Sequence, residues 1–410
     1  MSLSKETSNP KIFYGWFVVA ACFVVTMTLG ETFWSFGVFF KPLEAEFGWS
    51  RTVVSSGFTA FLLGYAISVV STGRLADRYS PRPILIAAAL AAGLGIALCS
   101  QVQSINQLRL FLFITGIGAG ATWTIPNSSV QRWFYKKRGA GLALGIVLAG
   151  VGMGAMVFAP LINYLILSYG WRNAYLIIGI LYFIIIGASA LVIKRSPVEI
   201  SAVLVGDEDV PRKVSVQSWT TSKVATPAFI GVTFAICVGT LALQSLSVHI
   251  VPHATDTGIS PTASAAALGL MGGFSVPGRI VSGLISDRIG WQKMMAFASF
   301  GMALSILWLI FLKDTWMLYC FAFFYGICHG IRVPTHIGIL GEFYGMRSLG
   351  EVIGITSAIT VFLGAFSPYM AGFIFDTTGS YLIAFLVMIV LLLSGGIIAM
   401  MIKKPLIALE

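Results

Sequence analysis

Two arginines lie inside long apolar stretches of the sequence, where a charged side chain is unusual. Arg279 follows Pro277, and Arg332 lies two apolar stretches later. A charge near the centre of a bilayer costs about 2.5–3.5 kcal/mol on insertion scales, so each arginine is a functional hypothesis by default. A guanidinium presents a planar fork of donors that matches a carboxylate. Arg279 therefore predicts an anion site, with an acid or carbonyl partner as the structural alternative, and Arg332 would favour a dianion or a monoanion with a further polar group.

Glu31 is the only acid well inside an apolar stretch, and two interpretations of it stay open. Buried alone, its carboxyl group would hold a proton and suit a proton carrier; beside Arg332 it would stay ionised and neutralise the arginine. His249 and His329 also lie in apolar stretches. Histidine titrates near physiological pH, although a lone helical histidine is more often a packing residue. Glu31, His249 and His329 are our candidates for proton coupling, and the two histidines also for substrate contact.

Further polar and aromatic side chains in the apolar stretches are candidates to line the same site. They are Trp123, Asn127, Gln244, Ser275 and Ser357. His329 and His336 are seven residues apart, two helical turns, so we expect no metal site. We also expect no cofactor and no enzyme activity, because no nucleophile–base pair stands out and no G-x-x-x-x-G-K-[ST] nucleotide loop occurs.

The elements that must position these residues are membrane-spanning helices. The chain of 410 residues is 57% hydrophobic and 10% charged, whereas soluble domains carry roughly 25% charged residues. Runs of about 20 apolar residues can cross a bilayer as helices, and no alternating strand pattern suggests a barrel. We predict an all-α membrane protein with twelve spans: 13–40, 52–72, 82–101, 105–131, 138–167, 171–194, 224–251, 261–285, 291–312, 315–341, 349–376 and 379–403.

The charge distribution predicts the orientation of these spans. The longest hydrophilic interruption, 195–223, separates a six-helix half at 1–194 from another at 224–410, as a linker. Of the 26 lysines and arginines, 19 fall on the side that holds both termini and five on the other. Positive residues favour the cytoplasmic side, so both termini are predicted to be cytoplasmic in a cell membrane. Topology thus explains the net charge of +10, and no nucleic-acid partner is expected.

An internal repeat supports two halves in the same orientation. At an offset of about 210 residues, Gly73-Arg-Leu-Ala-Asp77-Arg78 returns as Gly283-Leu-Ile-Ser-Asp287-Arg288. Weaker matches keep the same order, in the pairs Ser50 and Ser260, Phe134 and Phe343, Gly145 and Gly354, Pro160 and Pro368, and Gly170 and Gly379. Halves related by an axis along the membrane normal are one of the transporter architectures.

The two Gly-x-x-x-Asp-Arg segments resemble the signature loop of the major facilitator superfamily. Tyr14-Gly-Trp, Phe47-Gly-Trp-Ser-Arg51 and Arg132-Trp-Phe-Tyr-Lys-Lys-Arg-Gly139 resemble, more narrowly, its monocarboxylate transporter and oxalate/formate antiporter branch. The resemblance covers nearly the whole chain. It implies alternating access, with Gly73, Asp77, Arg78, Gly283, Asp287 and Arg288 forming latches that hold the outward-facing state. It also implies that Arg279 binds the substrate carboxylate.

The sequence departs from this branch at its proton relay. Animal monocarboxylate carriers have a lysine where this sequence has Trp34, and an aspartate where it has Ser275. The oxalate carriers have a lysine in their eleventh span, and the nearest position in this sequence is Ser357. We therefore expect a monomeric secondary transporter of a monocarboxylate such as lactate or pyruvate. Whether it carries a proton together with its cargo stays an open question at this point. The alternatives are a dicarboxylate or carboxylate exchanger, and a facilitator for an unrelated solute. A sensor would need a soluble output domain, which the sequence does not show.

Overall fold

The computed structural model describes residues 13–134, 139–194 and 226–403, and within them all regular structure is helical. The N-terminal half, as we use the term, comprises α1 (Gly15–Trp34), α2 (Phe36–Phe47), α3 (Arg51–Arg78), α4 (Pro81–Leu98), the short 3₁₀ helix η1 (Cys99–Gln101), α5 (Ile105–Trp133) and α6 (Ala140–Val192). The C-terminal half comprises α9 (Pro227–Asp256), α10 (Pro261–Ile289), α11 (Trp291–Ile310), α12 (Thr315–Gly364), α13 (Ser367–Thr378) and α14 (Leu382–Met401). The predicted linker 195–223 lies outside the described residues.

Length and polarity make these helices membrane spans. Within the described residues, eleven helical segments are long and apolar enough to cross a bilayer. One of them, α6, has 53 residues, which at 1.5 Å per residue is about 80 Å, far more than a hydrocarbon core of about 30 Å. Gly170 (φ 79°, ψ 157°) breaks α6, so it supplies two crossings. The twelve-span, all-α fold is thereby confirmed, and helices satisfy the backbone polar groups that lipid cannot.

Several predicted span boundaries were wrong. We ended the first span at residue 40, but α2 continues to Phe47 and places Lys41 on a helix. We placed a connection at 168–170, yet α6 runs through it and only Gly170 departs from helical geometry. We also placed a loop at 342–348, where α12 is helical. Polar residues are present at both places, but they do not show that the backbone stays helical through them or turns at a single glycine.

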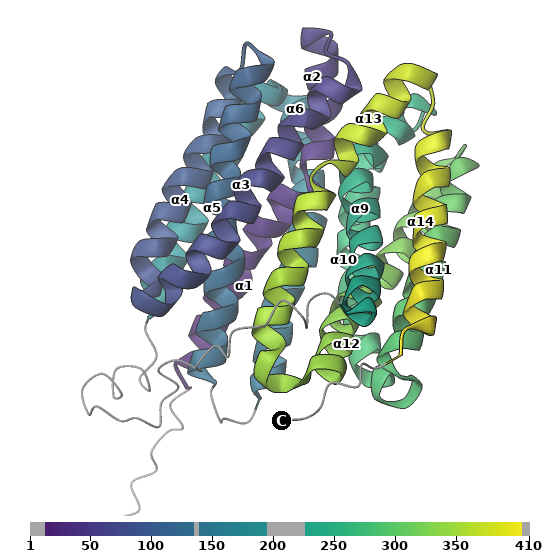
Figure 1. Cartoon of the computed structure of the whole chain (residues 1–410). Coiled ribbons are helices and arrows are strands. Elements are labelled where there is room, and N and C mark those ends of the chain that lie inside the picture. The colour runs from purple at the N-terminus through teal and green to yellow at the C-terminus, as the bar shows by residue number, and fades with distance from the viewer. Residues whose placement is uncertain (1–12, 135–138, 195–225, 404–410) are drawn as a thin grey trace, which may run out of the picture.

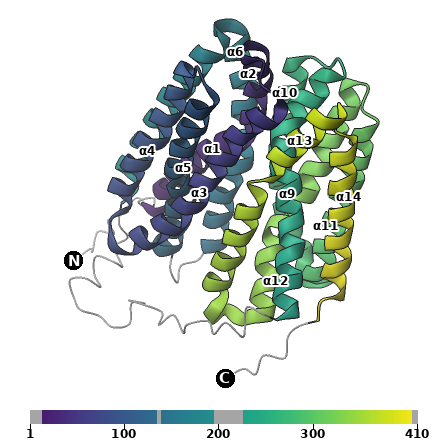
Figure 2. The same ribbon diagram turned by 45° about the horizontal axis from the view of Figure 1, so that its top comes forward.

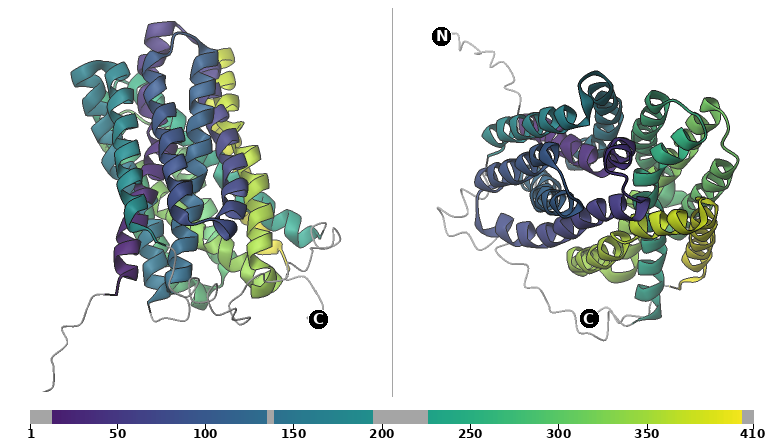
Figure 3. Two further views of the ribbon diagram at one scale, coloured as in Figure 1. Left: turned by 90° about the vertical axis from the view of Figure 1, so that its left-hand side faces the viewer. Right: turned by 90° about the horizontal axis from the view of Figure 1, so that it is seen from above.

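The two halves stand side by side, with their helices roughly along one direction (Figure 1). Seen from above in Figure 3, the purple-to-teal helices form one group and the green-to-yellow helices another. The first and last described helices, α1 and α14, begin and end on the same side (Figure 1). Contacts between the halves run through α6 with α10, α3 with α13, and α2 with α9.

The internal repeat is visible in local structure. Ser50 and Ser260 both cap the helix that follows, accepting hydrogen bonds from Val53 N (3.5 Å) and Ala263 N (3.2 Å). Gly170 and Gly379 both have positive φ, 79° and 69°, a conformation that favours glycine. The repeated sequence features thus mark equivalent turns in the two halves.

The halves pack closely at one end and diverge at the other. A Cβ on Gly152 of α6 would lie 2.5 Å from the carbonyl oxygen of Gly272 of α10, so the two backbones nearly touch there. Gly145 lies seven residues earlier on the same face of α6, and nothing lies within 4 Å of its Cβ position. Gly283 of α10 and Gly354 of α12 are equally open. We call this the open end, and the opposite end, where Arg51 lies, the closed end.

Candidate functional site

Arg279 reaches from the C-terminal half into the N-terminal half. It lies on α10, and its Nη1 donates a hydrogen bond to the carbonyl oxygen of Leu148 on α6. Its Nε is buried and has no hydrogen-bond partner. Among the described residues, no acid pairs with this guanidinium. A half-buried guanidinium with a buried, unpaired Nε donor and no counter-charge is an unsatisfied group that an anion would complete.

Arg332 is also buried without an acid, but its guanidinium is held within its own half. Its Nη2 donates to the carbonyl oxygens of Ala235 (2.6 Å) and Ile236 on α9. The group lies directly over Gly239, whose missing side chain leaves room for it. The predicted structural alternative, an ion pair with Glu31, does not occur in the described structure. Its Nε is likewise buried and unpaired.

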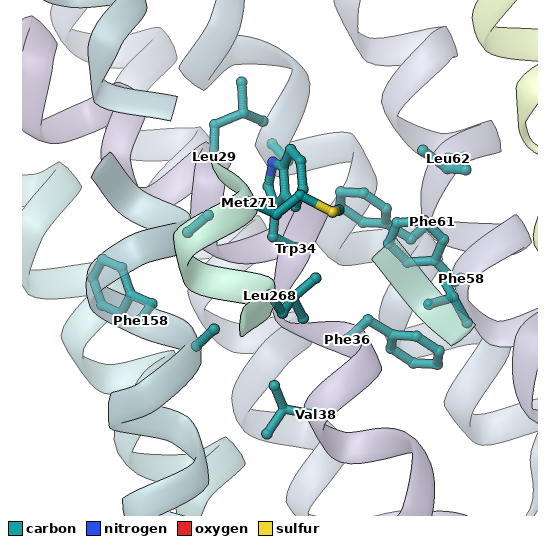
Figure 4. Close-up of a cluster of buried hydrophobic side chains, with 14 of the residues drawn as sticks. Leu29, Trp34, Phe36, Val38, Phe58, Phe61, Leu62, Phe158, Leu268 and Met271 are labelled. Carbon is teal, nitrogen blue, oxygen red and sulfur yellow. The ribbon is translucent and has the colours of Figure 1, made fainter. Parts of the chain in front are cut away.

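His329 lies between these arginines and the N-terminal half. It is within electrostatic range of both Arg279 and Arg332. Its ring meets Trp34 of α1 edge-on, with centroids 6.0 Å apart. Trp34 of α1 belongs to one cluster of buried apolar side chains together with Leu268 and Met271 of α10, several of which Figure 4 shows, so apolar side chains of both halves meet in this cluster. Trp34, at the position of the expected lysine, thus forms part of the contact between the halves.

Glu31 lies in the interior of the N-terminal half, away from the arginines. Its side chain is 5% exposed, and its Oε2 has no hydrogen-bond partner. The nearest polar groups include the phenols of Tyr175 and Tyr182 on α6. Of the two interpretations from the sequence, the structure therefore favours an isolated buried carboxyl group.

His249 lies at the closed end, 13 residues along α9 from Ile236, or about 20 Å. Its Nδ1 is 2.9 Å from the Tyr381 hydroxyl, and its Nε2 is 2.8 Å from the Pro368 carbonyl oxygen. A carbonyl only accepts, so Nε2 carries the hydrogen and Nδ1 accepts from Tyr381. Ser55 of the N-terminal half lies 3.2 Å from Nε2. His249 is thus a satisfied packing residue of the closed end, remote from Arg332.

The remaining predicted lining residues fall into two groups. Trp123 and Asn127 share a half-buried face of α5, and Asn127 Nδ2 donates to the Trp123 carbonyl oxygen at 2.7 Å. Ser357 is half-buried on α12. Ser275 is fully buried where α10 meets α6 and donates to Gly272 O at 2.6 Å, while Gln244 on α9 keeps a buried, unpaired Oε1. Substrate contact by these residues stays a prediction.

The predicted latches lie at the open end. The side chains of Asp77, Arg78 and Asp287 are outside the described residues. A Cβ on Gly73 would lie 4.0 Å from Thr124 Cγ2, and a Cβ on Gly283 would have nothing within 4 Å. The Arg288 side chain is exposed. The halves have diverged here, so this state does not test whether the latches close.

Residues that sequence reasoning missed form a polar cluster at the closed end. The sequence analysis includes Arg51 in the Phe47–Arg51 motif but gives it no partner, whereas its side chain is 5% exposed and bonds to Asp256 and Tyr381 of the C-terminal half. Asp376 accepts three hydrogen bonds from Arg51 and Thr52. The sequence does carry one signal for this cluster: acids lie at the ends of spans on the side of the membrane that has few positive residues.

Comparison with known proteins agrees with the fold and the sequence motifs. A model of the Major Facilitator Superfamily matches residues 17–331 and 254–406. Monocarboxylate transporter 13 of Rattus norvegicus is 27% identical over 401 residues, covering 95% of this chain and 89% of the relative. Monocarboxylate transporter 12 of Homo sapiens is 26% identical, with 93% and 79% covered. The crystal structure of a bacterial homologue of the lysosomal transporter Spinster, inward-facing and occupied, has the same fold (TM-score 0.74, 15% identity, 97% and 98% covered).

The chain belongs to the Major Facilitator Superfamily and is therefore a multi-pass membrane transporter. Within that superfamily, the relatives that it resembles over most of its length are named monocarboxylate transporters.

Proposed function

We propose that this transporter carries a small carboxylate by alternating access, with Arg279 as the anion-binding group. The observation that carries the proposal is the guanidinium of Arg279, which is half-buried between the halves, has no acid partner among the described residues and keeps its buried Nε donor unpaired. A carboxylate could replace the Leu148 carbonyl as acceptor and use both sides of the fork. Since that carbonyl belongs to the opposite half, cargo binding would change a contact between the halves.

Lactate or pyruvate is our first choice of cargo, supported by the names of the relatives. The test is uptake of labelled monocarboxylates into proteoliposomes holding the purified chain, with protein-free liposomes as control. Saturable uptake that unlabelled monocarboxylates inhibit would support the proposal. No uptake of any carboxylate, by protein shown to be folded, would overturn it. We further propose that the open end is cytoplasmic, because the positive-inside rule places both termini there.

A dicarboxylate is the second candidate, favoured by the buried Arg332 and the half-buried Arg279, neither of which pairs with an acid among the described residues. The two arginines leave two positive charges in the C-terminal half. Burying unpaired charge is costly, so a divalent anion would offset more of the cost than a monovalent one.

Arg332→Met tests this choice. If the cargo is divalent, we expect its uptake to fall about tenfold or more, since a charge-assisted hydrogen bond contributes roughly 1.5–3 kcal/mol. Uptake of a monocarboxylate should change much less. The measurement is uptake of labelled oxalate and lactate by the same preparation, with Arg332→Lys as the charge-conserving control. Equal loss for both cargoes would contradict a role in choosing the dianion.

We also propose that Glu31 carries the proton if transport is proton-coupled. An ionised carboxylate at this buried position would have neither a hydrogen bond at Oε2 nor a cation among the described residues. Its charge would therefore be expensive, and a proton would relieve that cost.

Glu31→Gln keeps the shape of a protonated Glu31 but cannot release a proton. We expect the variant to exchange carboxylate across the membrane at a rate close to wild type, while an imposed pH gradient no longer drives accumulation. Uptake with and without that gradient gives the measurement, and His249→Gln and His329→Gln test the two other candidates. Gradient-driven accumulation by Glu31→Gln at the wild-type level would remove Glu31 from consideration.

A further inference from the structure

The N-terminus of α3 is capped by a carboxylate from the opposite half. Asp376 of α13 accepts hydrogen bonds from the backbone N–H groups of Arg51 (3.0 Å) and Thr52 (2.8 Å), and from Thr52 Oγ1 (2.5 Å). Arg51 and Thr52 are the first two residues of α3, so these N–H groups have no partner within the helix. The positive end of the helix dipole adds to the attraction. Asp376 thus stabilises α3 only while the two halves are in contact.

The side chain of Arg51 makes a second connection between the halves. Its Nη2 donates to Asp256 Oδ2 of α9 at 2.5 Å, and its Nη1 to the Tyr381 hydroxyl at 2.8 Å. The guanidinium also lies over the Phe375 ring, 3.6 Å from its centroid. Because Tyr381 accepts from Arg51, its own hydrogen goes to His249 Nδ1, which completes a chain of hydrogen bonds from α3 to the Pro368 carbonyl.

Burial decides which of these contacts matter most. The Arg51 side chain is 5% exposed, whereas Lys41, which pairs with Asp256 at 2.6 Å, is 33% exposed. Exposed pairs contribute little, since water and salt screen them. Gly372 lets the backbones of α13 and α3 approach, because a Cβ there would lie 2.7 Å from the Arg51 carbonyl oxygen. Asp376 is itself exposed, so its effect comes from capping the two N–H groups of α3 and not from a buried ion pair. We therefore assign the main effect to the buried Arg51 side chain and to this cap, with Lys41 at the margin.

The equivalent contact in the repeat lacks this charge. Thr262 is the second residue of α10, as Thr52 is the second residue of α3. Its hydroxyl oxygen accepts a hydrogen bond from the Asn163 side-chain amide of α6 at 3.2 Å. A neutral amide cannot compensate a helix dipole as a carboxylate does. One interface between the halves therefore has a charged cap at the closed end and the other a neutral contact (Figure 2 shows α13 and α2 at this end).

We propose that Arg51, Thr52, Asp376 and Asp256 form a latch that holds the closed end shut and so sets the balance between the two access states of the transporter. Opening this end separates α3 from α13 and α9, and all these contacts break together. The proposal concerns the conformational equilibrium alone, so it does not depend on which solute is carried.

Asp376→Asn tests the latch, because it removes the charge and keeps the shape. The readout is a cysteine at Ser55, a fully buried residue that faces His249 across the closed interface. In purified Ser55→Cys protein, a polar maleimide should label this thiol in proportion to the population open at that end. We expect Asp376→Asn to raise the labelling rate about fivefold, because loss of the charge weakens the hydrogen bonds of this exposed cap and its attraction to the helix dipole. The protein without Ser55→Cys gives the background from the native cysteines.

Asn163→Ala is the matched control, since it disturbs the neutral contact of the repeat. We expect it to change the Ser55→Cys labelling rate less than twofold. Arg51→Lys, which keeps the charge but replaces the planar fork by a single nitrogen, should fall between. An unchanged rate in Asp376→Asn, or an equal rise in Asn163→Ala, would overturn the latch. Thermal unfolding of each variant separates a shifted equilibrium from a damaged fold, and no step requires a known cargo.

Discussion

Replacing Arg279 with alanine should lower carboxylate uptake by about a hundredfold or more. The guanidinium would supply two charge-assisted hydrogen bonds to the cargo, each contributing roughly 1.5–3 kcal/mol, and 1.4 kcal/mol corresponds to a factor of ten. Removal takes away both, together with a positive charge that bonds to the opposite half through the Leu148 carbonyl. The measurement is the initial rate of labelled uptake in proteoliposomes at equal protein content.

Stability provides the control for this prediction. In the cargo-free protein, Arg279 has no acid partner among the described residues and one unpaired donor, so its burial is a cost. Arg279→Ala should therefore unfold at the same temperature as wild type or higher. Arg279→Lys should keep part of the uptake, since it retains a charge but loses the fork. If Arg279→Ala unfolds early and its uptake falls only in proportion to the folded fraction, Arg279 is a structural residue.

Much of the architecture could be predicted because the bilayer imposes it on composition. Long apolar runs, a repeated signature segment and the bias of positive charge fix the number and order of the spans. The connection at 168–170 was predicted at the right place, but one glycine with positive φ replaces a loop there, and the polar segment 342–348 is helical although a loop was predicted. The boundary between α1 and α2 at Ser35 has no composition signal at all, since apolar residues continue on both sides.

The candidate site was harder to predict, because side-chain partners are a property of packing. The sequence identifies Arg279, Arg332 and Glu31 as charges in apolar runs, but it cannot tell whether Glu31 meets Arg332. The fold places Glu31 beside Tyr175 and Tyr182, and Arg332 against α9. The closed-end cluster was missed for a related reason. Arg51 and Asp376 are 325 residues apart, and each taken alone is an ordinary charge at the end of a span.

The glycines of α6 illustrate how one sequence feature serves two different purposes. Gly154 and Gly145 belong to the same glycine-rich stretch, yet they lie on opposite faces, nine residues apart. A Cβ on Gly154 would overlap the backbone of α1 at Met27, with Met27 C only 2.8 Å away. Gly145 has nothing within 4 Å, because α6 and α10 have diverged beside it. One glycine thus holds α1 against α6, and the other lies on an interface that is open in this state.

Gly154→Val should therefore prevent normal folding. The valine would strike backbone atoms, which cannot move unless α1 separates from α6, so we expect a loss of about 3 kcal/mol or more, at the upper end for overpacked interiors. Net stabilities are roughly 5–15 kcal/mol, so the folded yield should drop sharply. The measurements are the monodisperse fraction in size-exclusion chromatography and the unfolding temperature. A normal yield would show that α1 and α6 do not pack as described.

Gly145→Val is the matched substitution, and its outcome should differ in kind. Its side chain finds open space in the present state, so yield and unfolding temperature should equal those of wild type. When the open end closes, however, α6 and α10 must approach along the face that carries Gly145 and Gly152, and a valine would oppose that approach. We expect a folded protein whose uptake is slowed severalfold and whose Ser55→Cys labelling falls, because the state closed at the Arg51 end gains population. Wild-type uptake and labelling in Gly145→Val would mean that this face of α6 stays apart from α10 throughout transport.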